Sequence, residues 1–272
     1  MHIMAPIALT IAGSDSSGAA GIQADLKTFS ALGVYGASVI TALTAQNTRG
    51  VRAIHAVPGE FITAQLDAVL DDLDVAAIKI GMVGNTQAVT ALADRLGNVD
   101  NIPIVLDPVM VATSGDPLLE EDAEAILRQR LVPFADLITP NLEEAARLLG
   151  DVVAAPDEHA MGEQARRLME LGCEAVLIKG GHGHGSEAVD ILWDGKNETR
   201  LAAPRSETRN THGTGCTLSS AVAAGLAKGL PLGESCIRAK TYLSGALAEA
   251  DSLKVGQGSG PVHHFFDLWG EK

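Results

Sequence analysis

Residues 210–217 read Asn-Thr-His-Gly-Thr-Gly-Cys-Thr and gather residue types that are suited to binding an anion. Gly213 and Gly215 let the backbone turn tightly, so that successive N–H groups can point into one concavity. A helical pattern follows at once, and the N-terminus of a helix would add a partial positive charge there. The segment predicts an anion hole for a phosphate group; the alternative is a glycine-rich helix start that binds no ligand.

Common nucleotide-binding motifs do not explain this segment. Residues 13–18 have the glycine spacing of a P-loop, but Ala19 and Ala20 stand where that motif requires Lys and then Ser or Thr. No Gly-x-Gly-x-x-Gly sequence opens a helix after the first apolar run. A P-loop NTPase and a dinucleotide-binding enzyme are therefore both disfavoured.

The rest of the chain alternates short apolar runs with helical patterns, which is typical of repeated β-α-β units. The apolar runs that predict strands lie at residues 7–12, 39–42, 75–80, 104–106, 137–138 and 175–178. Right-handed crossovers assemble such units into a parallel sheet covered by helices. The sequence therefore predicts an α/β fold whose ligands would bind at the carboxyl ends of the strands.

The pattern changes after the last of these runs. Asp194-Gly195 is a hairpin turn signal, and it separates two further candidate strands at 188–193 and 199–203. Two long helical patterns complete the chain. We therefore predict an antiparallel edge on a central, mostly parallel sheet.

The composition favours one domain with an aliphatic core. The 272 residues are 46% hydrophobic but only 3% aromatic, so the interior must consist mainly of Ala, Val, Ile and Leu. No internal repeat, long linker or run of charges divides the chain. We expect residues 1–272 to form a single domain.

Charge and cysteine content limit the partners. The formal net charge of -14 would repel a nucleic acid, and no cluster of Lys and Arg offsets it. The three cysteines include no Cys-x-x-Cys pair, which argues against a disulfide framework and a structural zinc site. Neither a signal peptide nor an apolar run long enough to span a membrane is present. We expect a cytoplasmic protein without a nucleic-acid or membrane partner.

Several motifs occur together and point to one family. Gly-Thr-Gly-Cys opens a late helix, and it is preceded in the chain by Lys179-Gly180-Gly181. Further motifs lie at residues 10–15, 21–29, 39–48, 106–110, 139–144 and 260–264. Together these segments resemble the hydroxymethylpyrimidine/phosphomethylpyrimidine kinases of thiamine biosynthesis, in the vitamin-kinase branch of the ribokinase-like superfamily. The likeness extends from Ile7 to about Phe266.

The resemblance implies a three-layer ribokinase-like sandwich with helices on both faces of the sheet, and a homodimer. It also implies that ATP, with Mg²⁺, phosphorylates 4-amino-5-hydroxymethyl-2-methylpyrimidine and then its monophosphate. One turn departs from the family pattern, because Gly-Gly-Ala-Gly is replaced by Gly18-Ala19-Ala20-Gly21. The methyl group of Ala19 could restrict φ or crowd the substrate.

Five residues are candidates for the pyrimidine site: Gly13, Asp25, Gln46, Met82 and Val109. Gln46 offers an amide donor and acceptor that could pair with a ring nitrogen and an exocyclic amine, or could cap its own loop. Asp25 lies near the start of the first predicted helix, where a carboxylate is favourable with or without a ligand. Met82 and Val109 each follow a strand and could contact the ring or serve as ordinary core.

The phosphate groups of ATP would lie at the predicted anion hole. Lys179 ends a predicted strand and is followed by two glycines, so it is the best-placed cation for the transferred phosphate, unless it is an ordinary surface lysine. By resemblance, Thr211, Gly213 and Gly215 also contact the nucleotide, and Thr214 and Gly215 take part in catalysis with Gly213 and Lys179.

Asp107 and Glu144 are the candidate metal-site residues. Asp107 follows a predicted strand and Glu144 begins a predicted helix, and their oxygen atoms suit Mg²⁺. The resemblance assigns Glu144, within Asn-x-x-Glu, to the metal network; a plain first-turn glutamate is the alternative. His263 and His264 are adjacent and would point in opposite directions on an extended chain, so we expect structural roles for them.

Cys216 stands where the sugar kinases of this superfamily would place an aspartate base. A thiol at a helix N-terminus can be shifted towards thiolate, which predicts that Cys216 assists the hydroxymethyl nucleophile. A phosphate monoester is already anionic, and a fixed carboxylate would repel it. A small residue that merely fills the turn is the alternative.

Two rival functions stay open. Pyridoxal/pyridoxine kinase shares the fold and can share the Gly-Thr-Gly-Cys turn, but Gln46 within Ala-Gln-Asn-Thr favours the pyrimidine. A non-catalytic pyrimidine-binding protein would not need to neutralise a transferred phosphate, so Lys179 and Glu144 argue against it.

Overall fold

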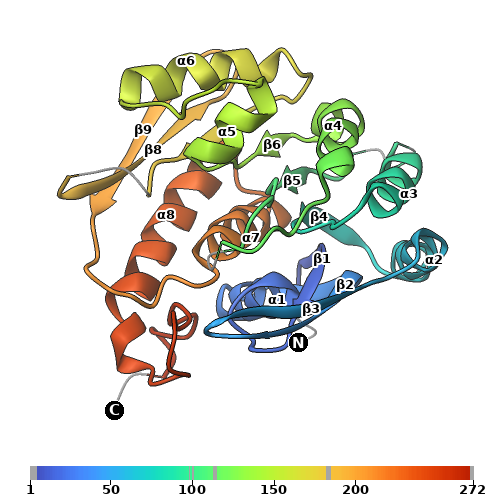
Figure 1. Ribbon diagram of the computed structural model, residues 1–272, viewed down its shortest axis with the longest axis horizontal. Coiled ribbons are helices and arrows are strands. Elements are labelled where there is room, and N and C mark those ends of the chain that lie inside the picture. The colour runs from blue at the N-terminus through green and yellow to red at the C-terminus, as the bar shows by residue number, and fades with distance from the viewer. Residues whose placement is uncertain (1–4, 98, 100, 113–114, 182–184, 270–272) are drawn as a thin grey trace.

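The computed structural model describes residues 5–97, 99, 101–112, 115–181 and 185–269, and these form one nine-stranded sheet with helices on both faces (Figure 1). The strands are β1 (Ile7–Asp15), β2 (Tyr35–Asn47), β3 (Gly50–Ala56), β4 (Val75–Ile80), β5 (Ile104–Leu106), β6 (Leu137–Ile138), β7 (Val176–Lys179), β8 (Glu187–Trp193) and β9 (Glu198–Pro204). The α-helices are α1 (Gly21–Ala31), α2 (Gly59–Leu70), α3 (Thr86–Leu96), α4 (Glu121–Arg130), α5 (Leu142–Leu149), α6 (Glu158–Met169), α7 (Thr214–Ala227) and α8 (Leu232–Ala248). Two 3₁₀ turns lie at Val132–Phe134 and Ala250–Ser252.

The sheet is parallel in its centre and antiparallel at both edges. Its strand order is β3-β2-β1-β4-β5-β6-β7-β8-β9. Adjacent strands are parallel along the run β2-β1-β4-β5-β6-β7. Strand β8 is antiparallel to β7, and β9 is antiparallel to β8. The predicted parallel sheet and the predicted hairpin at its edge are therefore confirmed.

The second antiparallel edge was not predicted. Strand β2 extends well beyond the predicted run at 39–42, and β3 folds back on it as an antiparallel partner. The last five residues of β3 are exposed, so this strand lacks the alternation of buried and exposed residues by which a strand is recognised in a sequence.

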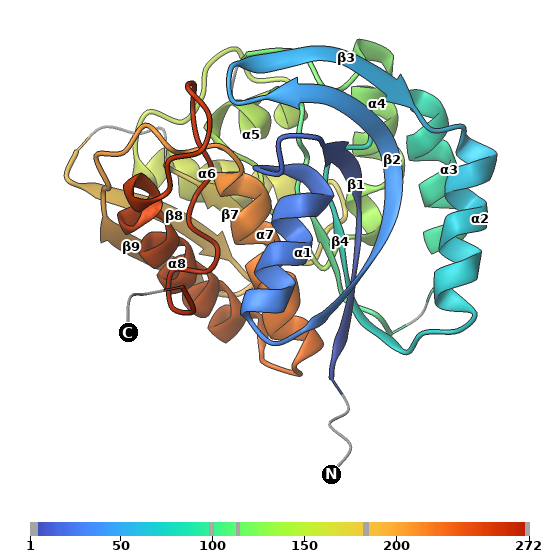
Figure 2. The same ribbon diagram turned by 90° about the horizontal axis from the view of Figure 1, so that it is seen from below.

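Two hydrophobic cores lie on opposite faces of the sheet. Leu9 and Ile11 of β1 face the core formed with α2 to α6, whereas Ala8 faces the core formed with α1, α7 and α8. Figure 2 shows the strands between α2 and α3 on one side and α1, α7 and α8 on the other. Because both faces are covered, the central strands are apolar throughout rather than alternating.

A fully buried charged pair lies within the second core. Lys79 of β4 points to the face covered by α7, and its Nζ lies 2.9 Å from Oδ2 of Asp25 in α1. Thr10 of β1 and Ser220 of α7 donate hydrogen bonds of 2.6 Å each to the same carboxylate. The cluster thus joins two strands and two helices, and it fixes α7 against the sheet.

The helices that the structure describes are short or polar by membrane standards. None of those in the described residues is both long and apolar enough to cross a membrane.

Candidate active site

The anion-hole segment lies directly on the first turn of the chain. Gly213 has a φ of 82°, and a Cβ atom there would overlap the carbonyl oxygen of Ala19. Gly21 has a φ of 56°, and a Cβ atom there would overlap the carbonyl oxygen of Gly13. Glycine is required at both positions because the backbones approach so closely. The N-terminus of α7 and the turn after β1 therefore form one unit.

The alanine that departs from the family pattern is tolerated in this unit. Ala19 is not among the residues with a positive φ, which in the described non-glycine residues occurs only at Asn101. The carboxylate of Asp15 accepts hydrogen bonds from the N–H groups of Ala19, at 3.1 Å, and Ala20, at 2.9 Å. The turn is thus held by Asp15, and the backbone of Ala19 is unstrained.

Hydroxyl groups complete the N-terminal turn of α7. Thr214 Oγ1 donates to the carbonyl oxygen of the exposed Thr211 at 2.6 Å, and Thr217 Oγ1 donates to that of Gly213 at 2.8 Å. His264 Nε2 lies 3.0 Å from Thr217 Oγ1, and burial lowers the pKa of His264 to about 3. His264 is therefore neutral, and it contacts the first turn of α7 through the Thr217 hydroxyl group.

Lys179, the last residue of β7, lies beside the predicted anion hole at the start of α7. Its Nζ lies 2.6 Å from Asp107 Oδ1 and 4.0 Å from Glu144 Oε2. A Cβ atom on Gly215 would lie 3.2 Å from Lys179 Nζ and 3.6 Å from Asp107 Oδ2. The absence of a side chain at Gly215 thus leaves room beside the ammonium group and the helix N-terminus. Ser219 Oγ donates to Asp107 Oδ2 at 3.2 Å.

The charges around Lys179 are strongly coupled. Burial raises the pKa of Glu144 to about 7, helped by the negative charge of Asp107 and opposed by Lys179. Burial would also raise the pKa of Asp107, but Lys179 and Lys79 outweigh it and hold this pKa below its ordinary value. Asp107 is therefore ionised, whereas the raised pKa of Glu144 places its change of protonation state near neutral pH.

The donor set fits a hard divalent cation that also binds phosphate oxygens. Asp107 and Glu144 supply carboxylate oxygens, which Mg²⁺ prefers. Within the part of the chain that the structure describes, no group of three or more His, Cys, Asp or Glu side chains could hold a metal ion. A cation held here would need ligands beyond the protein, as is usual for Mg²⁺ at nucleotide sites.

Glu144 also has a structural role. It accepts a hydrogen bond of 2.8 Å from the backbone N–H of Asn141, whose side chain accepts one of 2.9 Å from the N–H of Glu144. This capping box starts α5 and fixes the direction of the glutamate. A role in metal binding stays a prediction.

Cys216 differs from expectation in its ionisation. It is the third residue of α7 and is partly exposed. Burial raises the pKa of its thiol to about 11, although the nearby Lys79 ammonium group acts in the opposite direction. The expected shift towards thiolate is therefore wrong, because desolvation outweighs the Lys79 ammonium group. Cys216 stands at the site as a neutral thiol.

Gln46 lies at the end of β2, where the register with β3 shifts between Ala45 and Gln46. The extra residue at this shift is Arg52 of β3, opposite Gln46, and such bulges are frequent beside active sites. Nε2 of Gln46 lies 3.1 Å from Nε2 of His212, the residue that precedes Gly213. Gln46, the predicted pyrimidine-binding residue, is thus in direct contact with His212, which adjoins the predicted anion hole.

Three other candidate substrate residues lie near the carboxyl ends of β1, β4 and β5. A Cβ atom on Gly13 would lie 2.9 Å from Met82 Sδ, so these two residues pack together. Met82 is 7% exposed, and its carbonyl oxygen accepts a hydrogen bond of 2.6 Å from Thr41. Val109 follows Asp107 and is half-buried. Their contact with a substrate stays a prediction.

Asp25 has its carboxylate oxygens bonded within the protein. It is fully buried, and both oxygens accept hydrogen bonds from Lys79, at 3.0 and 2.9 Å. The structure thus supplies a reason for this residue in the fold, and a direct contact with substrate stays a prediction.

The sequence reasoning did not single out His212, Lys79 or Ser219 as site residues. His212 could have been found from its place in the glycine-rich motif. Lys79 carries a signal of its own, because a lysine within an apolar parallel strand must have a buried partner. Ser219 has no such signal, since a serine in a small-residue helix is common.

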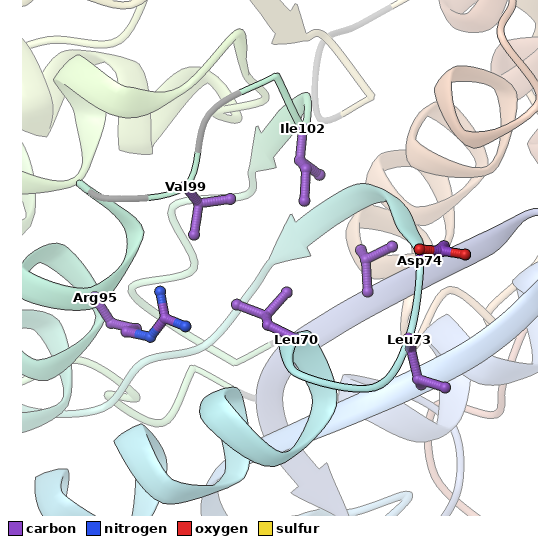
Figure 3. A pocket seen from close by; sticks show the side chains of 7 residues that line it. Leu70, Leu73, Asp74, Arg95, Val99 and Ile102 are labelled. Carbon is purple, nitrogen blue, oxygen red and sulfur yellow. The ribbon is translucent and has the colours of Figure 1, made fainter.

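A separate hollow lies away from these residues. It has a volume of about 400 Å³, and its lining includes Leu70, Leu73, Val75, Arg95 and Ile102 (Figure 3). Val75 begins β4 and Ile102 precedes β5, so this hollow opens at the amino ends of the strands. Ligands of open α/β sheets bind at the carboxyl ends, where Lys179 and Asp107 lie.

Comparison with known sequences gives a consistent result. The family model for phosphomethylpyrimidine kinase matches residues 15–263. The chain is 59% identical to the hydroxymethylpyrimidine/phosphomethylpyrimidine kinase of Rhizobium meliloti, over 98% of this chain and 99% of that protein. It is 55% identical to the protein of the same name from Escherichia coli, over 96% and 98%. A thiamine biosynthesis bifunctional protein of Geobacter sulfurreducens is 51% identical over 94% of this chain and 51% of that protein.

Solved structures share the fold. Phosphomethylpyrimidine kinase of Clostridium difficile has a TM-score of 0.78 and 43% identity, over 88% of this chain and 97% of that chain. An ADP complex of Bacillus subtilis pyridoxal kinase has a TM-score of 0.87 and 37% identity, over 96% and 97%.

Proposed function

This chain belongs to the phosphomethylpyrimidine kinase family, and we propose that it transfers phosphate from ATP to 4-amino-5-hydroxymethyl-2-methylpyrimidine and then to the monophosphate. It is a kinase of thiamine biosynthesis with the ribokinase-like fold. The observation that carries the proposal is the position of Lys179, 2.6 Å from Asp107 and beside Gly215 at the start of α7.

This arrangement suits phosphoryl transfer. The backbone N–H groups at the start of α7 would hold the transferred phosphate, with Gly213, Thr214 and Gly215 forming the hole and Thr211 at its rim. Lys179 would neutralise the charge that develops on that phosphate. Its pKa is held above the ordinary value by Asp107 and Glu144, which outweigh burial, so it stays charged.

Asp107 and Glu144 would hold Mg²⁺ together with the phosphate oxygens of ATP. When bound, this ion would neutralise phosphate charge and align the two outer phosphate groups. Asp107 also orients Lys179, so the same carboxylate would link the two cationic groups. Ser219 and Thr139 keep the Asp107 carboxylate in place through hydrogen bonds of 3.2 Å each.

The pyrimidine would lie between Gln46 on one side and Gly13, Met82 and Val109 on the other. Asp25 would contact the substrate from the start of α1, and its bonds to Lys79 and Ser220 hold α7 beside it. Cys216 would lie beside the nucleophile as an uncharged group. A neutral thiol lets both an alcohol and a phosphate monoester approach, whereas a fixed carboxylate would repel the monoester.

The test is to follow ADP release and to identify the products, with the free pyrimidine and with its monophosphate as substrates. We expect ADP release with both. Release with pyridoxal alone would favour a pyridoxal kinase, the function named for the Bacillus subtilis structure. Pyrimidine binding without ADP release would favour a non-catalytic binding protein.

We also propose a single kinase domain over residues 1–272 that works as a cytoplasmic homodimer without a nucleic-acid partner. The continuous sheet supports the single domain, and the net charge of -14 supports the absence of nucleic acid. The dimer follows from family resemblance. Sedimentation analysis of the purified protein would test it.

A further inference from the structure

Two hydrogen bonds hold the backbone of Gln46, so only its side chain can turn. Ser16 Oγ donates to the carbonyl oxygen of Gln46 at 2.8 Å and accepts from its N–H at 2.9 Å. These two bonds fix the end of β2 to the turn after β1. The direction in which Gln46 offers its amide donor and acceptor therefore depends on the groups around the amide.

Two side chains contact the opposite ends of this amide. Thr44 Oγ1 donates to Gln46 Oε1 at 3.0 Å, and Gln46 Nε2 lies 3.1 Å from His212 Nε2. An amide nitrogen carries only donors, so His212 Nε2 must act as the acceptor and carry no proton. The second N–H and the second lone pair of the amide remain available to a ligand.

Both contacting side chains are themselves anchored. The single proton of Thr44 Oγ1 is shared between Gln46 Oε1 and the carbonyl oxygen of Ser14, each 3.0 Å away, and Thr44 is 8% exposed. The backbone N–H of His212 donates to the carbonyl oxygen of Gly260 at 3.0 Å, and His212 is 6% exposed. The amide thus lies between two groups of fixed position and opposite hydrogen-bonding character.

The ionisation of His212 agrees with its role as an acceptor. Burial lowers its pKa, and the carboxylate of Asp15 only partly opposes this effect. Asp15 Oδ2 lies 3.6 Å from His212 Nε2, beyond hydrogen-bond distance, and it already accepts from two backbone N–H groups. His212 is therefore neutral, with its proton on Nδ1.

We propose that His212 and Thr44 fix the orientation of the Gln46 amide and thereby make the site selective for a 4-aminopyrimidine over the corresponding 4-oxopyrimidine. This inference rests on the proposed function and names the residues that would determine which pyrimidine the enzyme accepts. His212 acts through Gln46 and is a positioning residue.

The two pyrimidines differ in the order of hydrogen-bond donors and acceptors that they present to an amide group. A 4-aminopyrimidine has an acceptor at N3 beside a donor amine, which pairs with the N–H and C=O of a primary amide. A 4-oxopyrimidine has a donor at N3 beside an acceptor oxygen, and it pairs only after the amide has turned over. An amide held by His212 and Thr44 would face the oxo compound with donor against donor and acceptor against acceptor.

The test compares kcat/KM for the 4-amino substrate with kcat/KM for its 4-oxo analogue. We expect the amino-to-oxo ratio to fall about tenfold in His212→Leu and in Thr44→Val, the scale of one hydrogen bond left unmatched. Thr44→Ser keeps the hydroxyl group and should keep the ratio of the wild-type protein. His159→Leu, on the exposed surface of α6, serves as the matched histidine control.

A purely structural role for His212 predicts another result. Both values of kcat/KM would then fall together in His212→Leu and Thr44→Val, and an unchanged ratio would overturn the proposal. If His212→Leu does not fold, Thr44→Val and Thr44→Ser decide the question.

A second measurement does not depend on turnover. Nitrogen NMR of the ¹⁵N-histidine-labelled wild-type protein should show a neutral His212 ring with a bare Nε2 and a protonated Nδ1. A ring with its proton on Nε2 would overturn the proposed amide orientation. If the wild-type protein does not phosphorylate the 4-aminopyrimidine at all, the proposed function fails, whereas the NMR result still decides the state of His212.

Discussion

Lys79 and Asp25 form an ion pair 2.9 Å long in which both side chains are fully buried between the sheet and α7. The pair is isolated from water but not from other polar groups, since Thr10 and Ser220 also bond to the carboxylate. Removing one member of such a pair leaves an uncompensated charge, which costs far more than the net stability of the pair itself.

Lys79→Met should therefore reduce the free energy of unfolding by about 3–5 kcal/mol, because the Asp25 carboxylate would stay buried without its main partner. Denaturant unfolding measures this change. The double variant Lys79→Met/Asp25→Leu should cost clearly less than the sum of the two single variants. Additive costs would mean that the two charges do not stabilise each other.

Lys179→Ala should lower kcat on the order of a hundredfold, with a much smaller effect on pyrimidine binding, because its charge is needed where phosphate charge shifts. Steady-state kinetics with varied pyrimidine and varied ATP measure both effects. Lys196→Ala, on the exposed turn between β8 and β9, is the control. A normal kcat with only a raised KM for the pyrimidine would count against this role.

Gln46→Leu should weaken pyrimidine affinity by about 1–3 kcal/mol for each ring group left unpaired. ATP affinity should stay nearly normal, because His212 keeps the backbone hydrogen bond to Gly260 that holds it beside Gly213. Calorimetry with the pyrimidine and, separately, with a non-hydrolysable ATP analogue would measure both. Normal binding of the pyrimidine by this variant would remove Gln46 from the substrate site.

Cys216→Asp should retain more of the first phosphorylation than of the second, because a fixed carboxylate repels the phosphate monoester. Cys216→Ala should lower both steps to a similar extent, since the neutral thiol is not acting as a base in this structure. The two phosphorylations are measured separately with the free pyrimidine and its monophosphate. A loss in Cys216→Ala that is confined to the first step would restore the base hypothesis.

The pH dependence of stability should reflect Glu144. Its pKa is raised from 4.5 in the unfolded chain to about 7 in the folded protein, so the folded state holds this proton more tightly. The contribution of Glu144 to stability should be constant below about pH 4.5, fall as the pH rises, and level off above about pH 7. Glu144→Gln should remove this fall, as measured by denaturant unfolding across the range. An equally steep fall in the variant would assign it to other groups.

Much of the fold follows from patterns that buried strands must show. The runs at 75–80 and 104–106 correspond to β4 and β5 because a strand covered on both faces has to be apolar. Strand β3 was not predicted, because most of its residues are exposed and therefore show no apolar pattern. Periodicity describes burial, and it cannot describe a strand that pairs at an edge without being buried.

The site was predicted in part for the same kind of reason. Lys179, Asp107 and Gly215 follow elements that the sequence makes visible, and their proximity follows from the geometry of a parallel sheet. The state of Cys216 could not be predicted, because the balance between helix dipole and burial depends on packing from α1 and β4. The bond between Gln46 and His212 joins residues far apart in the chain, and no local pattern contains it.

The close approach of Gly213 to the Ala19 carbonyl group also affects how the chain folds during synthesis. The anion hole is completed only when the start of α7 settles on the Ala19 carbonyl, and His212 pairs in turn with Pro261 near the other end of the chain. Contacts between such distant segments form late and slowly. On the ribosome, these contacts should therefore form only after nearly all of the chain has emerged.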